Sequence, residues 1–352
     1  MQSEKYSRDN AGQSLKKYIL LKQGELAYNH GASKAKQFGC CYELTEPEAR
    51  IPYVYHCFKI NEDEYTPYVA MALNNTKMDQ QLKRLVSSSV RMDGLLNISF
   101  EDYMSVTLHL PSFIEQKHIA DFLTKLDERI AYQERLITSL KKYKRGVIQH
   151  IFRSSHTLIK RSQWQQVRLG DIFKKVSRRN TNGKIKNVIT NSAEYGLIPQ
   201  RDFFDKDIAV DGNTSNYYVI EEGDFVYNPR KSNNAPFGPF NRYTLSEQGI
   251  ISPLYTCLVL QANINPSYLA WYFKSDAWHR YIYDNGSQGV RHDRVSMTDN
   301  LLMGIPVIYP ERKIQDSIAN TLDLIESRLH LAQNKLDLLN IERNGFMQQL
   351  FI

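Results

Sequence analysis

The sequence has no apolar run long enough to span a membrane, and it has few cysteines. No stretch approaches the roughly 18 apolar residues that a spanning helix needs, and residues 1–10 are polar and mixed in charge, unlike a secretion signal. We therefore expect a cytoplasmic location. The four cysteines include no pair with zinc-ligand spacing. Cys57 and Cys257 lie in apolar, strand-like runs, so we expect buried free thiols there.

The usual signatures of a catalytic or nucleotide-binding centre are also missing. Gly183-Lys184 lacks the partner glycine and the following hydroxyl of a phosphate-binding P-loop. The nine histidines show no pairing typical of a metal site, and Asp205 and Asp207 have no suitably placed nuclease lysine after them. We predict no catalytic residue, no metal site and no cofactor site in this chain.

One dipeptide has a partial likeness to a catalytic motif. Asn228-Pro229 begins like the tetrapeptide of adenine methyltransferases, whose asparagine holds the exocyclic amine of the base. Arg230 and Lys231 follow it, where a methyltransferase has proline and an aromatic residue. No glycine-rich cofactor loop follows a strand nearby, so we predict that the chain is not an enzyme by itself.

Length and charge are those of a basic protein with more than one domain. The 352 residues suggest two to three domains, and 42% hydrophobic with 24% charged residues is typical of a soluble globular protein. A net charge of +7 and an isoelectric point near 9.0 favour a polyanionic partner such as nucleic acid.

The sequence is written twice, with the second copy starting 199 residues after the first. Residues 111–152 overlay 310–351 without a gap, and Tyr28-Asn29 matches Tyr227-Asn228 at the same step. A further set of matches at a step of 200 comprises Tyr55, Cys57, Tyr68, Ala70, Val90, Arg91 and Asp93. A period this long exceeds that of solenoid repeats. It indicates two similar domains in tandem.

Each copy has two unlike parts. The first part is rich in aromatic and β-branched runs bounded by turn residues, as at 217–220, 223–227 and 254–260, which predicts strands. Residues 266–278 have the spacing of a short helix, with Ser267 as its expected cap and 66–73 as its counterpart. These parts are predicted to be mixed α and β domains.

The second part of each copy has the 3.5-residue apolar period of a coiled-coil seam. The predicted seam residues are Ile119, Leu123, Leu126, Ile130, Ile137 and Leu140, repeated as Ile318, Leu322, Ile325, Leu329, Leu336 and Leu339. Each segment would form a helix of about 55 Å, and its obvious partner is its twin. Gly146 and Gly345, near the helix ends, mark either close helix approach or fraying.

These patterns predict an α+β fold: two mixed α/β domains in pseudo-twofold tandem repeat, separated by two long helices that form an antiparallel coiled coil. The predicted boundaries are 1–108 and 156–305 for the domains, and 109–155 and 306–352 for the helices. The first copy has no counterpart of residues 164–199, so we expect its domain to be truncated at its N-terminus. That would leave a sheet edge unpaired.

The motifs together resemble the specificity subunit of Type I restriction-modification systems. The likeness rests on Leu169-Gly170-Asp171-Ile172, on the run Gly-Asp-Phe-Val-Tyr-Asn at 223–228, and on Gly289-Val290-Arg291. It extends to Pro111 followed by Glu115-Gln116 and Ile119-Ala120, and to the closing runs at 146–149 and 345–351. Ile314-Gln315 stands in the second copy in place of Glu115-Gln116, which is a departure from the pattern.

The resemblance implies a DNA-binding, non-catalytic subunit of a restriction system. Its two target recognition domains would each read half of a split double-stranded DNA sequence, and the helices would set the spacer. The implied partners are methyltransferase (modification) subunits, expected to be two, and a restriction and translocase subunit. S-adenosylmethionine, ATP and Mg are expected on those partners, which would perform adenine methylation (DNA modification) and cleavage. The alternative is a degenerate or half-functional subunit that acts mainly as a scaffold for methyltransferase subunits.

Basic loops supply the candidate DNA-binding residues, because Lys and Arg neutralise phosphates and Arg also reads guanine. The candidates are Asn228, Arg230 and Lys231 with Lys34 and Lys36 in the first copy, Arg291, His292 and Arg294 with Arg91 in the first copy, and Arg178 with Arg179. In the alternative interpretation Tyr227 and Asn228 hold a turn, the shared Arg pairs with the shared Asp, and the other cations are solvated.

Overall fold

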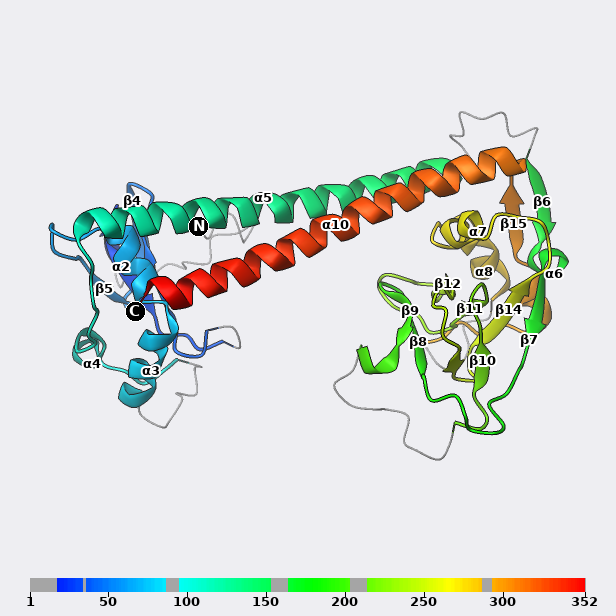
Figure 1. Cartoon of the computed structure of the whole chain (residues 1–352), viewed down its shortest axis with the longest axis horizontal. Helices are drawn as coiled ribbons and strands as arrows, with labels where there is room; N and C mark the ends of the chain where they lie inside the picture. The colour runs from blue at the N-terminus through cyan, green and yellow to red at the C-terminus, as the bar shows by residue number, and fades with distance from the viewer. Residues whose placement is uncertain are drawn as a thin grey trace. The chain divides into compact units, whose positions relative to one another are not determined.

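A computed structural model describes residues 18–33, 36–86, 95–152, 164–202, 214–286 and 293–351. The chain forms two compact units: unit 1 comprises Met1–Leu136 with Ala332–Ile352, and unit 2 comprises Ile137–Leu331. Two long helices, α5 (Phe113–Phe152) and α10 (Arg312–Leu350), each contribute one half to each unit (Figure 1). Within the described ranges, every helix is too short or too polar to cross a membrane.

Unit 1 contains a three-stranded sheet and a two-stranded sheet. The elements are β1 (Tyr18–Lys22) paired with β4 (Glu48–Pro52), the sheet β3 (Cys40–Glu43)–β2 (Leu26–Asn29)–β5 (His56–Phe58), and helices α2 (Thr66–Ala72), α3 (Thr76–Leu85) and α4 (Phe100–Met104). The core of the unit brings Leu26, Tyr28 and Tyr68 together with Leu123 of α5 and Phe351 beyond the end of α10. The helix halves are thus part of the fold of the unit.

Unit 2 repeats this arrangement and adds strands. Its sheets are β12 (Phe240–Arg242)–β11 (Phe225–Tyr227)–β14 (Thr256–Leu260)–β7 (Phe173–Val176), β10 (Tyr218–Ile220)–β13 (Gly249–Ile251), β15 (Pro306–Tyr309)–β6 (Gln165–Arg168) and β8 (Ile189–Ser192)–β9 (Gly196–Pro199). The helices are α6 (Leu169–Ile172), η3 (Gln200–Asp202), α7 (Pro266–Phe273), α8 (His279–Asn285) and α9 (Asp299–Met303). Strand β15 falls inside segment 306–352, which the sequence had assigned to the second helix; the remaining boundaries stay predictions.

The duplication extends to single hydrogen bonds. Tyr28 donates its hydroxyl to the Phe38 carbonyl at 2.6 Å, and Tyr227 donates to the Phe237 carbonyl at 2.8 Å. The glycine after each acceptor has positive φ, 79° at Gly39 and 84° at Gly238. A Cβ there would collide with the carbonyl oxygen of Asn29 or Asn228, so both turns require glycine.

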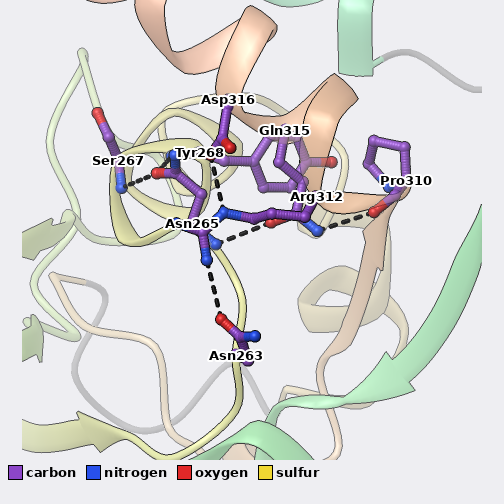
Figure 2. Close-up of polar contacts among 8 residues, drawn as sticks. All are labelled: Asn263, Asn265, Ser267, Tyr268, Pro310, Arg312, Gln315 and Asp316. Atoms are coloured by element: carbon purple, nitrogen blue, oxygen red, sulfur yellow. Dashed lines mark hydrogen bonds and ion pairs between the residues drawn. The ribbon is translucent and has the colours of Figure 1, made fainter.

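The start of α7 differs from the sequence prediction. Its cap is Asn265, whose Oδ1 accepts the backbone N–H groups of Ser267 at 2.8 Å and Tyr268 at 3.1 Å. The predicted cap, Ser267, donates its hydroxyl to Asp323 instead. The reason is positional: Pro266 occupies the first helical turn, where a backbone N–H has no partner in the helix and is not needed. The residue before it therefore caps the helix, and Figure 2 shows the side chain of Asn265 accepting from the backbone of Ser267.

The end of α7 also differs from the sequence prediction. The helix stops at Phe273, whereas the predicted helix continued to Trp278. Ser275 donates its hydroxyl to the Tyr272 carbonyl at 2.6 Å, and the indole N–H of Trp278 donates to the Phe273 carbonyl at 3.1 Å. These side chains satisfy the carbonyls that a continuing helix would have used. A second helix, α8, then begins at His279.

In each unit the halves of α5 and α10 pack on one another as the seam predicts. Each of the twelve predicted seam residues is buried or half-buried. In unit 1 the buried Gln133 donates its amide to the Ala332 carbonyl at 2.7 Å, and these two residues are the same position of the two copies. Contact between equivalent positions is expected of two repeated helices that run antiparallel.

The two helix glycines do not mark close approach. A Cβ added at Gly146 or Gly345 would meet no atom within 4 Å, and both helices continue past these positions. Of the two predicted buried thiols, Cys257 is 1% exposed, whereas Cys57 is only half-buried. The difference has a structural cause, since Cys257 pairs with Val176 of β7, whereas among the described strands β5 pairs only with β2.

Candidate DNA interface

Asn228 is a buried residue that shapes the first basic loop of unit 2. Its Oδ1 accepts the backbone N–H of Arg230 at 2.9 Å, and its Nδ2 donates to the Asn191 carbonyl at 3.3 Å. In unit 1 Asn29 accepts the N–H of Gly31 at 2.9 Å in the same way. At 6% exposure Asn228 presents little surface to a ligand. Its place supports the alternative interpretation, in which it holds the turn that presents Arg230.

The two basic loops of unit 2 meet at Arg230 and Arg294, whose backbones form an isolated antiparallel bridge. Two flanking backbone bonds fix the pair: Lys231 N–H donates to the Asp293 carbonyl at 2.8 Å, and Val295 N–H donates to the Pro229 carbonyl at 2.9 Å. Arg230 is exposed and Lys231 half-buried. The loops, distant in sequence, therefore form one cationic surface on an anchored backbone.

The charges at this bridge are only partly balanced by protein groups. Asp293 approaches Arg294 at 3.7 Å, beyond hydrogen-bond distance, and Arg294 Nε is buried without a hydrogen-bond partner. No salt bridge to Arg230 or Lys231 is formed by the residues that the structure describes. Neighbouring cations of one sign in this setting attract an anion such as a phosphate.

Tyr255 is a member of this surface that the sequence did not single out. Burial raises the pKa of its phenol, while the nearby Arg230 and Arg294 guanidinium groups lower it. The half-buried ring therefore lies within electrostatic range of both arginines. The only signal for it in the sequence was the match of Tyr55 and Tyr255 at a step of 200.

Unit 1 has the same backbone arrangement without the cations. The bridge that corresponds to Arg230 and Arg294 joins Gly31 and Leu95. Lys36 is half-buried, and its Nζ donates to the Asn74 carbonyl at 3.3 Å. Lys34 and Arg91 lie outside the described residues, as do Arg291 and His292 of unit 2. Among the described residues, the cationic bridge is therefore a feature of unit 2.

Arg178 and Arg179 are adjacent in sequence but differ in environment. Arg178 forms ion pairs with Asp224 and, at 3.4 Å, with Glu221. Burial raises the pKa of the Asp224 carboxyl, opposed by the Glu221 backbone N–H and by Arg178. Arg179 is exposed, and its Nη1 donates to Asn216 at 3.1 Å. The charge of Arg178 is thus used within the fold, whereas that of Arg179 faces outward.

No protein-family model matches the sequence. Among solved structures, a Type I restriction-modification S subunit from M. genitalium aligns with 96% of this chain and 85% of its own, at 15% identity and a TM-score of 0.53. A chain of a type I restriction-modification system, solved to explain complex assembly and conformational transition, aligns over 94% and 82%, at 15% identity and a TM-score of 0.55. An HsdS subunit from Thermoanaerobacter tengcongensis aligns over 94% and 81%, at 13% identity and a TM-score of 0.48.

The two alignments with TM-scores of 0.53 and 0.55 cover nearly the whole chain, and they establish its fold. The chain has the mixed helix-and-strand fold of type I restriction-modification S subunits, with the long helices in place. The predicted fold class is confirmed. Fold alone does not assign function, which depends on the residues of the site.

Proposed function

We propose that this chain is the DNA-specificity subunit of a type I restriction-modification complex. It binds double-stranded DNA, has no catalytic activity of its own, and directs adenine methylation and cleavage by partner subunits. The observation that carries the proposal is the Arg230–Arg294 bridge, an anchored cationic pair without full internal compensation, on a fold of the S-subunit type.

The geometry of the bridge suits sequence recognition. A guanidinium presents parallel N–H donors that match O6 and N7 of guanine in the major groove. Arg230 extends from a turn fixed by Asn228 and by the close approach of Gly238. A fixed backbone limits the directions in which the side chain can reach, and this restriction favours one base over another. Lys231 and Arg179 are assigned to phosphates.

The target is proposed to be split, because the loop architecture occurs twice. Unit 2 should read its part with Arg230 and Arg294. Unit 1 presents Gly31 and Leu95 at the same bridge, so its part depends on other residues, among them Lys34, Lys36 and Arg91. This difference also supports the second candidate function, a half-functional subunit in which unit 2 alone reads bases and the rest serves as a scaffold.

The long helices are proposed as the docking platform for the modification subunits, two per chain. On α10 two leucines that are spaced by seven residues face solvent: Leu324 is 56% and Leu331 68% exposed. Large exposed apolar residues in register on a helix are typical of a partner surface. S-adenosylmethionine, ATP and Mg are assigned to the methyltransferase and restriction subunits.

The test is methylome sequencing of cells that carry the chain with its cognate methyltransferase. We expect methylated adenines in one two-part motif with a constant spacer. Arg230→Ala should weaken binding of the purified complex to that motif by about 1–3 kcal/mol and relax one base position if Arg230 reads a base. Arg280→Ala, in an exposed pair with Asp284 on α8, is the matched control.

Two results separate the candidate functions. A motif with only one specified part would favour the half-functional subunit. A complex that binds specific and random duplexes equally, and whose affinity is unchanged by Arg230→Ala, would contradict DNA recognition altogether.

A further inference from the structure

Unit 1 has an apolar groove that none of the described residues of the unit fills. A pocket of about 260 Å³ is lined by Phe58, Ile60, Val69, Leu73, Val106 and Leu108. At its rim Met104 is 48% and Leu110 37% exposed. A cavity of about 150 Å³ already accommodates a benzene ring, so this groove has room for at least one large apolar side chain.

The corresponding place in unit 2 is filled. The positions one repeat later, such as Leu258, Leu269, Phe273, Ile305 and Val307, belong to the core of that unit. The same core contains Leu169, Ile172 and Phe173, which come from the strand–turn–strand segment β6–α6–β7. Phe173 packs edge-on against Phe225 at 5.0 Å. In unit 2, three apolar side chains of one short segment therefore occupy the space that corresponds to the open groove of unit 1.

The backbone shows the same difference. In unit 2, β7 pairs with β14 and β6 pairs with β15. In the described part of unit 1, β5 pairs only with β2, so its other edge is free. Residues 107–110, the counterpart of β15, form no strand, and the backbone groups of Leu108 and Leu110 have no hydrogen-bond partner there. Unpaired edges beside an apolar groove favour the addition of a strand.

We propose that this groove binds a strand–turn–strand segment of a second polypeptide that differs from this chain and has the apolar pattern of residues 165–176. In a second copy of this chain, Leu169, Ile172 and Phe173 of that pattern are already part of the core of unit 2. Its first strand would pair with residues 107–110 and its second with β5, and the apolar residues of the turn would fill the pocket. Residues 1–17 do not carry this pattern, since their only large apolar side chains are Met1, Tyr6 and Leu15. The inference concerns protein–protein contact and does not depend on the DNA-binding role.

The register of unit 2 makes a site-specific test possible. Val176 lies opposite Cys257, so the same residue of a bound peptide would lie opposite Cys57. Side chains directly opposite in an antiparallel pair approach the separation that a disulfide needs. A synthetic peptide of residues 164–176 with Val176→Cys, activated as a mixed disulfide with thionitrobenzoate, is added to the full chain at alkaline pH. The Cys57 thiolate attacks the peptide sulfur, the new disulfide forms and thionitrobenzoate leaves.

We expect one peptide per chain, located at Cys57 by mass spectrometry, with at least a tenfold lower yield for a peptide activated at Lys175→Cys. Cys57→Ser should reduce the yield to background. Leu169→Asp with Ile172→Asp in the peptide should do the same, and these changes leave the fold of the chain untouched. Leu108→Lys in the groove is the reciprocal variant.

Several outcomes would overturn the proposal. One is an equal yield from the two cysteine positions, and another is a yield that the Asp substitutions leave unchanged. A yield that falls as chain concentration rises, together with dimers in sedimentation, would assign the groove to a second copy of this chain. A several-fold rise in yield on deletion of residues 1–17 would assign it to the chain's own N-terminal residues.

Discussion

Lys144 and Glu326 form an ion pair between α5 and α10 in unit 2, with Nζ 2.6 Å from the carboxylate. Its twin in unit 1 joins Arg343 to Asp127. Arg343 lies 199 residues after Lys144, and Glu326 lies 199 residues after Asp127. The same cross-helix contact is thus made once in each unit, with the roles of the two helices exchanged. Such exchange is the mark of a duplicated, antiparallel helix pair.

The Lys144–Glu326 pair should contribute measurably to stability, because both side chains are largely buried, at 22% and 28% exposure. Glu326→Lys should lower the free energy of unfolding by about 1 kcal/mol, and adding Lys144→Glu should restore most of the loss. Urea unfolding of the four chains gives the coupling energy. The exposed pair Arg280–Asp284 is the control and should show a smaller coupling. A coupling energy of zero in this cycle would mean that the two charges do not interact.

Replacing Gly146 or Gly345 by alanine should stabilise the protein. Each lies inside a long helix, where glycine is less favourable than alanine by about 0.5–1 kcal/mol. Because a Cβ at either position meets no atom within 4 Å, Gly146→Ala and Gly345→Ala should each raise the free energy of unfolding by that amount.

The control for the glycine variants is Gly238→Ala, which should be strongly destabilising, because its Cβ would collide with the Asn228 carbonyl. Circular dichroism in urea measures all three variants. A loss of stability at Gly146 or Gly345 would show that the helix surface there is covered, for instance by a partner.

Arg178→Ala and Arg179→Ala should separate folding from DNA binding. Arg178 pairs with the buried carboxylate of Asp224, so its loss should lower the free energy of unfolding by about 1–3 kcal/mol. Arg179 is exposed, so its loss should change stability by less than about 0.5 kcal/mol and weaken DNA binding uniformly across sequences. Urea unfolding and binding at several salt concentrations distinguish the two. The reverse assignment would show that Arg178 leaves Asp224 to contact DNA.

Stability should fall as the pH drops below about 6.5, the ordinary pKa of histidine. Burial lowers the pKa of His279 in unit 2, opposed by Asp276, and burial also lowers that of His56 in unit 1. A lowered folded-state pKa means that the unfolded chain takes up the proton first, so acid favours unfolding. His279 packs against Phe237 at 4.9 Å, and charging its ring there is unfavourable.

The pH prediction is measured by urea unfolding between pH 7.5 and 5.5. His279→Gln should reduce the slope of stability against pH. The same change at His118, an exposed residue of α5, is the matched control. A slope that is identical in all three chains would contradict the role of His279.

The duplication was visible in the sequence because it is a comparison of residues at a fixed step. The seam was visible because a 3.5-residue period reports one face of a helix, whatever the helix packs against. These two patterns predicted the fold class, the twin helices and the loop at Asn228. The prediction of the α7 cap was wrong because a neighbouring residue determines it. Ser267 was expected to cap the helix, but Pro266 occupies the first turn and Asn265 is the cap.

Only the tertiary structure decided which cations are available. Nothing in the sequence distinguishes the neighbouring residues Arg178 and Arg179. The buried Asp224 pairs with Arg178, from which it is 46 residues distant in the sequence. Arg230 and Arg294 come together through a backbone bridge that no sequence pattern marks. The open groove of unit 1 likewise emerges only when its side chains are compared with their counterparts in unit 2. The periodicity of the sequence determined where the helices and strands of this protein form. Backbone bridges and ion pairs between residues far apart in the sequence determined which side chains remain available to bind a partner.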